Sequence, residues 1–224
     1  MGTVTRTGWQ VIVPVKRIAE GKSRLANFAG SLRSDLAYAI AMDTIAAAIS
    51  SPAVARLLVV TDDQRVGAEA AGLGARVVAD PGVGLNAALR HGADLAAALE
   101  PAAPLAALQG DLPALRAADL TGALDLAGSH ERAFVSDTEA TGTTLLTAGS
   151  RSLFEPAFGI GSNRAHRQRG FVELDAFDTA TAGGFRWRSL HRDVDTDDSL
   201  REAAVLGLGR RTQLVFEQLT ARPS

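Results

Sequence analysis

The sequence predicts an α/β fold of three layers, in which a mixed, mostly parallel sheet carries helices on both faces. Three observations predict it. Short runs rich in valine and isoleucine alternate four times with longer stretches rich in alanine and leucine, a rhythm typical of parallel strands joined by helical crossovers. This rhythm changes toward the carboxyl end. The composition, 46% hydrophobic in 224 residues, suffices for one sizeable core.

Four short apolar runs predict the parallel strands. They cover residues 9–15, 56–61, 75–79 and 105–109. A predicted helix follows each strand, and these helices cover residues 31–50, a stretch that ends near Gly72, residues 86–100 and residues 117–128. The first helix has a Ser/Asp start and a stop signal at Ser51-Pro52.

The later part of the chain predicts a different arrangement. Residues 132–136 and 143–148 flank a turn region rich in threonine, glycine and aspartate, which predicts an antiparallel pair. Residues 185–194 alternate polar and apolar side chains, as a half-exposed strand does. Closing helices are predicted over residues 199–207 and 211–219.

The overall composition excludes several classes of function. A net charge of −2 and a pI near 6.1 argue against nucleic acid or an anionic membrane as the main partner. Without cysteine there can be no disulfide, zinc-thiolate site or thiolate nucleophile. No signal-peptide profile or membrane-spanning run is visible, since Asp43 interrupts the best candidate. We expect a cytoplasmic protein with one domain over residues 1–224, a core at about 9–206 and a closing helix at 209–220; a homo-oligomer is compatible with this.

Three cations follow the first predicted strand. Lys16, Lys22 and Arg24 lie within nine residues, and ligands of open parallel sheets bind beyond the carboxyl ends of the strands. Such cations suit a triphosphate because charge-assisted contacts to phosphate are strong; a solvated loop is the alternative. Gly21 to Ser23 mimic the end of a P-loop, but Lys16 stands where a P-loop needs glycine, which excludes that motif.

The second and third strands end in weaker signals. Asp62 is predicted either to contact a nucleotide or to cap a helix, and Asp63 to be a cap. Residues 80–87 match the loose dinucleotide fingerprint but follow the wrong strand, and Ala102 stands where its acidic partner would be. We interpret the glycines as letting the backbone approach a base or ribose, with Asn86 as helix cap or ligand.

Aspartates after the fourth strand and near residue 194 predict a metal site. Asp111 sits beside a glycine at a strand end, and Asp193 and Asp195 are two apart, so both point to one face of a strand. Mg²⁺ prefers one or two carboxylates with phosphate oxygens and water; turn aspartates are the alternative. Asp197 and Asp198 are interpreted as N-caps of the helix that follows.

Two further segments offer hydrogen-bond donors. Residues 142–146 carry paired hydroxyls and residues 158–162 form a glycine-rich turn, and both can present donors to a carboxylate. Strand threonines and a tight turn are the alternatives. His166 follows closely, and the sequence leaves open whether it is functional or structural.

Taken in order, six segments carry a resemblance: residues 13–25, 84–88, 110–113, 142–146, 158–162 with His166, and 193–196. They resemble the guanylyltransferases of deazaflavin coenzyme F(420) biosynthesis, over about residues 11–206. The resemblance implies a single three-layer Rossmann-like nucleotidyltransferase domain. It implies transfer of GMP from GTP to phosphoenolpyruvate or, equally, to 2-phospho-L-lactate. The alanine- and arginine-rich composition resembles the bacterial branch of the family, which favours phosphoenolpyruvate.

The resemblance also implies roles for particular residues. Mg²⁺ would lie on Asp111, Asp193 and Asp195. The acid would lie on Thr144, Gly159 and Ser162, with Thr143 and Gly161 as the near-register alternatives. The nucleotide would contact Pro14, Lys16, Lys22, Asp62, Leu85 and Asn86. Catalysis would use Lys16, Lys22, Arg24 and Asp111. In one departure from the family pattern, Asp197-Asp198 stand where relatives often have Pro-Glu, which leaves the start of the next helix open.

Two other interpretations stay open on the sequence. Another nucleotidyltransferase, such as one that guanylylates the molybdenum cofactor or cytidylylates a sugar alcohol phosphate, shares the phosphate loop and the late aspartates. That interpretation gives residues 158–162 no role. A nucleotide-binding regulator on a decayed fold is the non-enzyme alternative, and the retained aspartates at 111, 193 and 195 argue against it.

Overall fold

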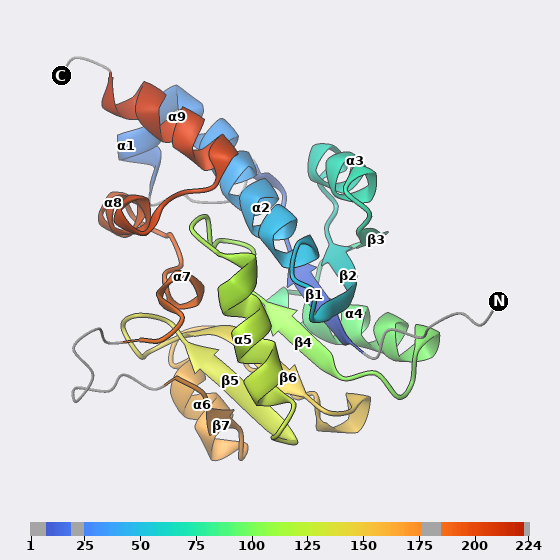
Figure 1. Ribbon diagram of the computed structural model, residues 1–224. Helices are drawn as coiled ribbons and strands as arrows, with labels where there is room; N and C mark the ends of the chain where they lie inside the picture. The colour runs from blue at the N-terminus through green and yellow to red at the C-terminus, as the bar shows by residue number, and fades with distance from the viewer. Residues whose placement is uncertain (1–7, 19–24, 176–184, 222–224) are drawn as a thin grey trace.

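The computed structural model describes residues 8–18, 25–175 and 185–221, and within these ranges a seven-stranded sheet forms the centre of the molecule (Figure 1). The strand order is β3-β2-β1-β4-β6-β5-β7. The strands are β1 (Trp9–Pro14), β2 (Val54–Val60), β3 (Arg76–Val78), β4 (Leu105–Leu108), β5 (Arg132–Ser136), β6 (Thr143–Ala148) and β7 (Val172–Glu173).

The pairing of these strands confirms the mixed, mostly parallel sheet. β1 runs parallel to both β2 and β4, and β3 runs parallel to β2. β6 is antiparallel to β4 and to β5, as the turn-rich segment between β5 and β6 predicts. β7, a two-residue strand that the sequence pattern does not reveal, pairs parallel to β5.

Helices cover both faces of the sheet (Figure 1). They are α1 (Ala26–Ala29), α2 (Arg33–Ile49), α3 (Gln64–Gly72), α4 (Leu85–Leu99), α5 (Ala117–Ala127), α6 (Ser162–Gln168), α7 (Arg188–His191), α8 (Asp197–Leu206) and α9 (Arg210–Thr220). Alternate residues of β1 divide the core: Val11 and Val13 pack with α2 and α5, whereas Ile12 packs with α4. The three-layer prediction is therefore confirmed.

The predicted strand over residues 185–194 is wrong. The chain there makes the short helix α7, and Ser189, His191 and Arg192 are buried although the alternating pattern marks them as exposed. Their polar groups find partners far away in the sequence: the Ser189 hydroxyl donates to Asp119, and Arg192 pairs with Glu139 and Glu202. Buried polar groups need such partners, and a local sequence pattern cannot show them.

Helix capping agrees with the sequence prediction at the start of α3 and differs from it at the start of α8. Asp63 caps α3 as predicted, accepting from the backbone N–H groups of Arg65 and Val66 at 3.1 Å each. Its other oxygen accepts from the Ile18 N–H at 3.0 Å, which ties the loop after β1 to α3. The N-cap of α8 is Thr196, in a reciprocal capping box with Ser199, whereas the predicted caps Asp197 and Asp198 lie in the first turn.

The helix α9 packs along α2, and Asp43 of α2 holds its start. The Asp43 carboxylate accepts from the N–H groups of Arg211 at 3.3 Å and Thr212 at 2.7 Å. Leu219 of α9 and Ile40 of α2 belong to one buried cluster. Within the described ranges, no helix has both the length and the apolar character needed to cross a bilayer.

Asp43→Ala is expected to lower the free energy of unfolding by about 1 kcal/mol, because it leaves two N–H groups at the start of α9 without an acceptor. For a chain of this size, that corresponds to a fall in Tm of about 2–4 °C, measurable by thermal unfolding. Asp35→Ala is the matched control, since Asp35 lies on the same helix in an exposed ion pair with Arg65, and such pairs contribute little. The same thermal unfolding measurement tests the predicted single domain, since a second unfolding transition in the wild type would contradict it.

Candidate active site

Two adjoining cavities lie at the carboxyl ends of β1 and β4. The first cavity has a volume of about 360 Å³ and the second about 650 Å³, both within the range of small-molecule sites. Their linings share Leu85, Gln109, Asp111 and Asp195. Ligands in the two cavities would therefore meet at Asp111 and Asp195.

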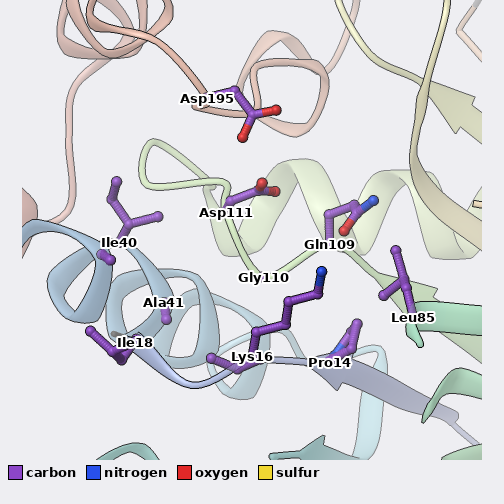
Figure 2. A pocket seen from close by; sticks show the side chains of 12 residues that line it. Pro14, Lys16, Ile18, Ile40, Ala41, Leu85, Gln109, Gly110, Asp111 and Asp195 are labelled. Carbon is purple, nitrogen blue, oxygen red and sulfur yellow. The ribbon is translucent and has the colours of Figure 1, made fainter. Parts of the chain in front are cut away.

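The first cavity is bounded by the end of β1 and by α2. In Figure 2, Lys16 rises from the end of β1 into the cavity, and Asp195 faces Asp111 across it. The ends of β1 and β4 approach closely because residue 110 is glycine: a Cβ there would lie 2.9 Å from the Pro14 carbonyl oxygen. The first cavity thus combines a cation with two carboxylates at the end of the sheet where ligands bind.

Five carboxylates form an acidic cluster in the second cavity; they are Asp111, Asp137, Glu139, Asp193 and Asp195. Oxygens of Asp137, Glu139 and Asp193 lie within 4.8 Å of one another. Burial, followed by the charges of the other four acids, raises the pKa of Asp193 from 3.8 to about 7. An all-oxygen donor set whose charges repel fits a hard divalent cation, so this cluster is an acidic site that could hold a metal.

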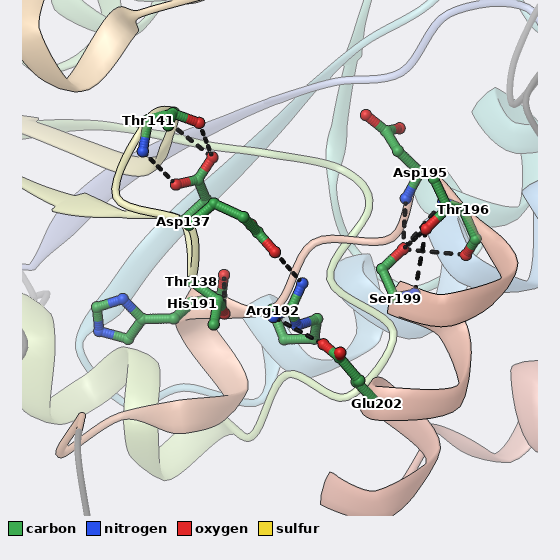
Figure 3. Close-up of polar contacts among 11 residues, drawn as sticks. Asp137, Thr138, Thr141, His191, Arg192, Asp195, Thr196, Ser199 and Glu202 are labelled. Atoms are coloured by element: carbon green, nitrogen blue, oxygen red, sulfur yellow. Dashed lines mark hydrogen bonds and ion pairs between the residues drawn. The ribbon is translucent and has the colours of Figure 1, made fainter.

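Backbone contacts hold the acidic cluster in place. The Val194 N–H donates to the Asp111 carbonyl at 3.0 Å, and the Thr138 N–H donates to the His191 carbonyl at 3.0 Å. The Asp195 N–H donates to the Ser199 hydroxyl at 3.1 Å (Figure 3). The carboxylates are therefore brought together by the fold from three separate segments.

Arg192 binds one acid of this cluster and one acid outside it. Its guanidinium, which is 8% exposed, donates to Glu139 of the β5–β6 turn and to Glu202 of α8, each at 2.8 Å (Figure 3). Asp137 is also engaged by the fold, since it accepts from the N–H groups of Thr141 at 2.8 Å and Gly142 at 2.7 Å. Asp137 and Glu139 thus have protein partners within the fold, and Asp193 is the acid of the cluster whose pKa is raised.

The far wall of the second cavity is the turn before α6. Gly159 and Gly161 adopt positive φ angles of 135° and 73°, a backbone conformation that favours glycine. The buried Ser162 follows them, and its N–H donates to the Gly159 carbonyl at 3.0 Å. This turn and Thr143 of β6 line the same cavity as the acidic cluster.

Most of the residues predicted from the sequence line one or both cavities. These are Pro14, Lys16, Leu85, Asp111, Asp193, Asp195, Gly159 and Ser162. Thr143 lines the second cavity, whereas the Thr144 hydroxyl faces the Val135 and Ser136 carbonyls at 3.4 and 3.5 Å. Lys22 and Arg24 lie outside the described residues.

Two predicted nucleotide contacts are placed elsewhere by the structure. The Asn86 amide donates to the Phe158 carbonyl at 2.9 Å and accepts from the Phe158 N–H at 2.8 Å, so it ties α4 to the turn before α6. The exposed Asp62 accepts from the Asp80 N–H at 3.1 Å and is not among the residues lining either cavity.

Sequence reasoning missed Asp137, Glu139 and Arg192. The first two are acids spaced two apart after a strand, the same signal that identified Asp193 and Asp195. That signal was overlooked because the segment between β5 and β6 has the composition of a turn. Nothing local marks Arg192, because its two acidic partners come from distant segments.

The arrangement of sheet and helices is the nucleotidyltransferase fold. A CMP:2-keto-3-deoxy-manno-octonic acid synthetase complexed with CTP superposes with a TM-score of 0.54 at 14% identity, covering 94% of this chain and 99% of that one. A 4-diphosphocytidyl-2C-methyl-D-erythritol synthase from Anaerococcus prevotii superposes with a TM-score of 0.58 at 11% identity, covering 89% and 96%. Such low identities establish the fold alone.

Sequence similarity then narrows the class. The family model described as "Guanylyl transferase CofC like" matches residues 9–220, and the chain belongs to this family. A phosphoenolpyruvate guanylyltransferase from Streptomyces coelicolor is 50% identical over 215 residues, which cover 94% of this chain and 97% of that protein.

Proposed function

We propose that the protein transfers GMP from GTP to phosphoenolpyruvate, forming enolpyruvyl-diphospho-guanosine and pyrophosphate in coenzyme F(420) biosynthesis. The observation that carries this proposal is the pair of cavities that meet at Asp111 and Asp195. A transfer between two substrates needs their reacting phosphates side by side. The 50% identity to the Streptomyces coelicolor enzyme supports the choice of both substrates.

In this proposal GTP occupies the first cavity and the acid the second. Pro14 and Leu85 line the nucleotide side, and Lys16 reaches the phosphates, together with Lys22 and Arg24 as predicted from the sequence. The turn with Gly159 and Ser162, and a threonine of β6, bind the acid. Thr143 lines the second cavity, whereas the Thr144 hydroxyl faces the Val135 carbonyl, so we favour Thr143 for a hydroxyl contact.

We further propose that Asp111, Asp193 and Asp195 hold Mg²⁺, whose charge, when bound, would offset that of the substrate phosphates. A phosphate oxygen of the acid attacks the α-phosphorus of GTP in line, a new P–O bond forms, and the bond to the β-phosphate oxygen breaks. Pyrophosphate leaves with the bonding electrons, and Lys16 stabilises its charge. No covalent protein intermediate is needed.

The decisive experiment is product identification. Incubation with GTP, Mg²⁺ and phosphoenolpyruvate should release pyrophosphate and give a product with the mass of enolpyruvyl-diphospho-guanosine. GTP should be preferred over ATP, CTP and UTP. With 2-phospho-L-lactate we expect slower transfer, because the two acids differ only in shape at the carbon that bears the phosphate, which provides about 1–3 kcal/mol of discrimination. Equal pyrophosphate release from all four nucleotides would refute guanylyl transfer.

A further inference from the structure

His166 of α6 lies completely buried behind the second cavity. Three aromatic rings surround its imidazole, those of Phe134, Phe158 and Phe171, with ring centroids 5.9, 5.3 and 5.6 Å away. Both ring nitrogens nevertheless have polar partners. Nε2 lies 2.9 Å from the Ala157 backbone nitrogen, and Nδ1 lies 2.8 Å from the Thr143 hydroxyl oxygen.

These two contacts fix the position of the imidazole proton. A backbone N–H can only donate, so Nε2 must accept from Ala157 through its lone pair. In a neutral imidazole the proton then lies on Nδ1 and is donated to the Thr143 oxygen. Burial, followed by the charge of Arg169, lowers the pKa of His166 to about 4, which keeps the ring neutral near pH 7.

This position of the imidazole proton affects the hydroxyl of Thr143, a residue that lines the second cavity. Because its oxygen accepts from His166, the hydroxyl proton must point to another acceptor. Among the residues that the structure describes, His166 is the only hydrogen-bond partner of this hydroxyl. The neighbouring Thr144 hydroxyl differs from that of Thr143, because it faces the Val135 and Ser136 carbonyls of the adjacent strand β5.

The same imidazole anchors the turn that forms the far wall of the cavity. Ala157 is held by His166 of α6, and the next residue, Phe158, is held at both its N–H and its carbonyl by Asn86 of α4. Two helices therefore fix consecutive residues just before Gly159. His166 thus contacts both this turn and Thr143.

We propose that His166 is a positioning residue, which directs the Thr143 hydroxyl proton into the second cavity as a donor to an anionic oxygen of the acid substrate. This rests on the proposed function, since it takes the second cavity as the acid site. The hydroxyl becomes an obligate donor there. It favours a carboxylate or phosphate oxygen, which can only accept, over a neutral hydroxyl, which could also donate.

Two substitutions separate the two hydrogen bonds of His166. In His166→Gln the amide oxygen can replace Nε2 as the acceptor from Ala157, but no donor remains for Thr143. In His166→Asn the amide nitrogen can replace Nδ1 as the donor to Thr143. We expect the KM for phosphoenolpyruvate to rise about 10- to 100-fold in His166→Gln, the range of a hydrogen bond to a charged group. We expect a smaller rise in His166→Asn, and a KM for GTP close to that of the wild type in both.

Thr143→Val tests the same bond from its other side. It should raise the KM for the acid as much as His166→Gln does. The double variant that combines Thr143→Val with His166→Gln should have the same acid KM as Thr143→Val alone, because both changes remove the same hydrogen bond. Thr147→Val is the matched control: it removes a buried hydroxyl of the same strand that donates to the Ala133 carbonyl, and it should leave the acid KM unchanged. Additive effects in the double variant, or equal rises for GTP and the acid, would overturn the proposal.

The proton position can be read directly from ¹⁵N NMR of the His166 imidazole, without substrate. We expect a proton on Nδ1 and no titration between about pH 5.5 and 8. A proton on Nε2 would overturn the proposal whatever the kinetics show. If the wild type made no guanosine product, the proposed function would fail and the acid-directed role with it. If the wild type were active but Thr143→Val and His166→Gln kept the wild-type acid KM, only the role of His166 would fail.

Discussion

Asp195→Asn and Asp111→Asn should each lower kcat on the order of 100- to 1,000-fold, the scale of removing one electrostatic contact from a transition state. Both carboxylates line the two cavities where they meet, so each loss removes charge at the proposed metal and reacting phosphates. Neither side chain belongs to the apolar core clusters, so the variants should stay folded. Steady-state kinetics over a range of Mg²⁺ concentrations, with thermal unfolding as a check, provide the measurement.

Asp198→Asn is the matched control for these two variants. Asp198 belongs to the same acidic run, lies exposed in the first turn of α8, and does not line either cavity. It should keep the activity of the wild type. If Asp195→Asn retained full activity with unchanged Mg²⁺ dependence, the aspartates at 111 and 195 would be turn residues and not ligands.

The second large effect concerns the pH dependence of stability without metal. The pKa of Asp193 is raised from 3.8 to about 7 by burial and then by the neighbouring acids. Between these values the Asp193 carboxyl of the folded state holds a proton that the unfolded state has lost, so the contribution of Asp193 to stability falls as pH rises from about 4 to about 7 and is then level. Buried neutral His166, whose pKa is lowered to about 4, contributes in the opposite sense up to about pH 6.5, so the Asp193→Asn variant is the reference. Relative to that variant, the Tm of the wild type without metal should be higher at pH 5.5 than at pH 8.

Mg²⁺ should reverse this order, because it binds the ionised carboxylates and competes with the proton. It should raise the Tm more at pH 8 than at pH 5.5. Asp193→Asn should remove this part of the pH dependence and weaken the response to Mg²⁺, whereas Asp125→Asn, a change at an exposed aspartate of α5, should resemble the wild type. If the metal-free Tm changed equally from pH 5.5 to pH 8 in the wild type and in Asp193→Asn, the placement of Asp193 among repelling acids would be contradicted.

The parallel half of the sheet was predictable from the sequence because its strands are buried on both faces. Such strands are short, uniformly apolar runs, and β1, β2 and β4 follow that pattern with little ambiguity. The failure at residues 185–194 has the opposite cause. There, polar side chains are buried by partners on other segments, so the local alternation no longer reports exposure.

The site was predictable where one segment carries the signal. Asp111 follows an apolar run, Asp193 and Asp195 belong to one acidic segment, and Gly159 and Ser162 belong to a recognisable turn. Contacts that join two distant segments were not predictable. Asn86 has the sequence context of a helix cap or ligand, but its amide meets Phe158 only in the folded chain. The contact between His166 and Thr143 likewise joins residues 23 positions apart.

The packing of α9 on α2 has a consequence for work with altered ends of this chain. Ile40 of α2 lines the first cavity and also belongs to the buried cluster that contains Leu219 of α9. A truncation before Arg210 would therefore remove the outer support from a wall of the first cavity. It would also remove the two N–H groups of α9 that donate to Asp43, a residue about 170 positions earlier in the sequence. Fusion partners and purification tags are best placed at the amino end, where they leave this support intact.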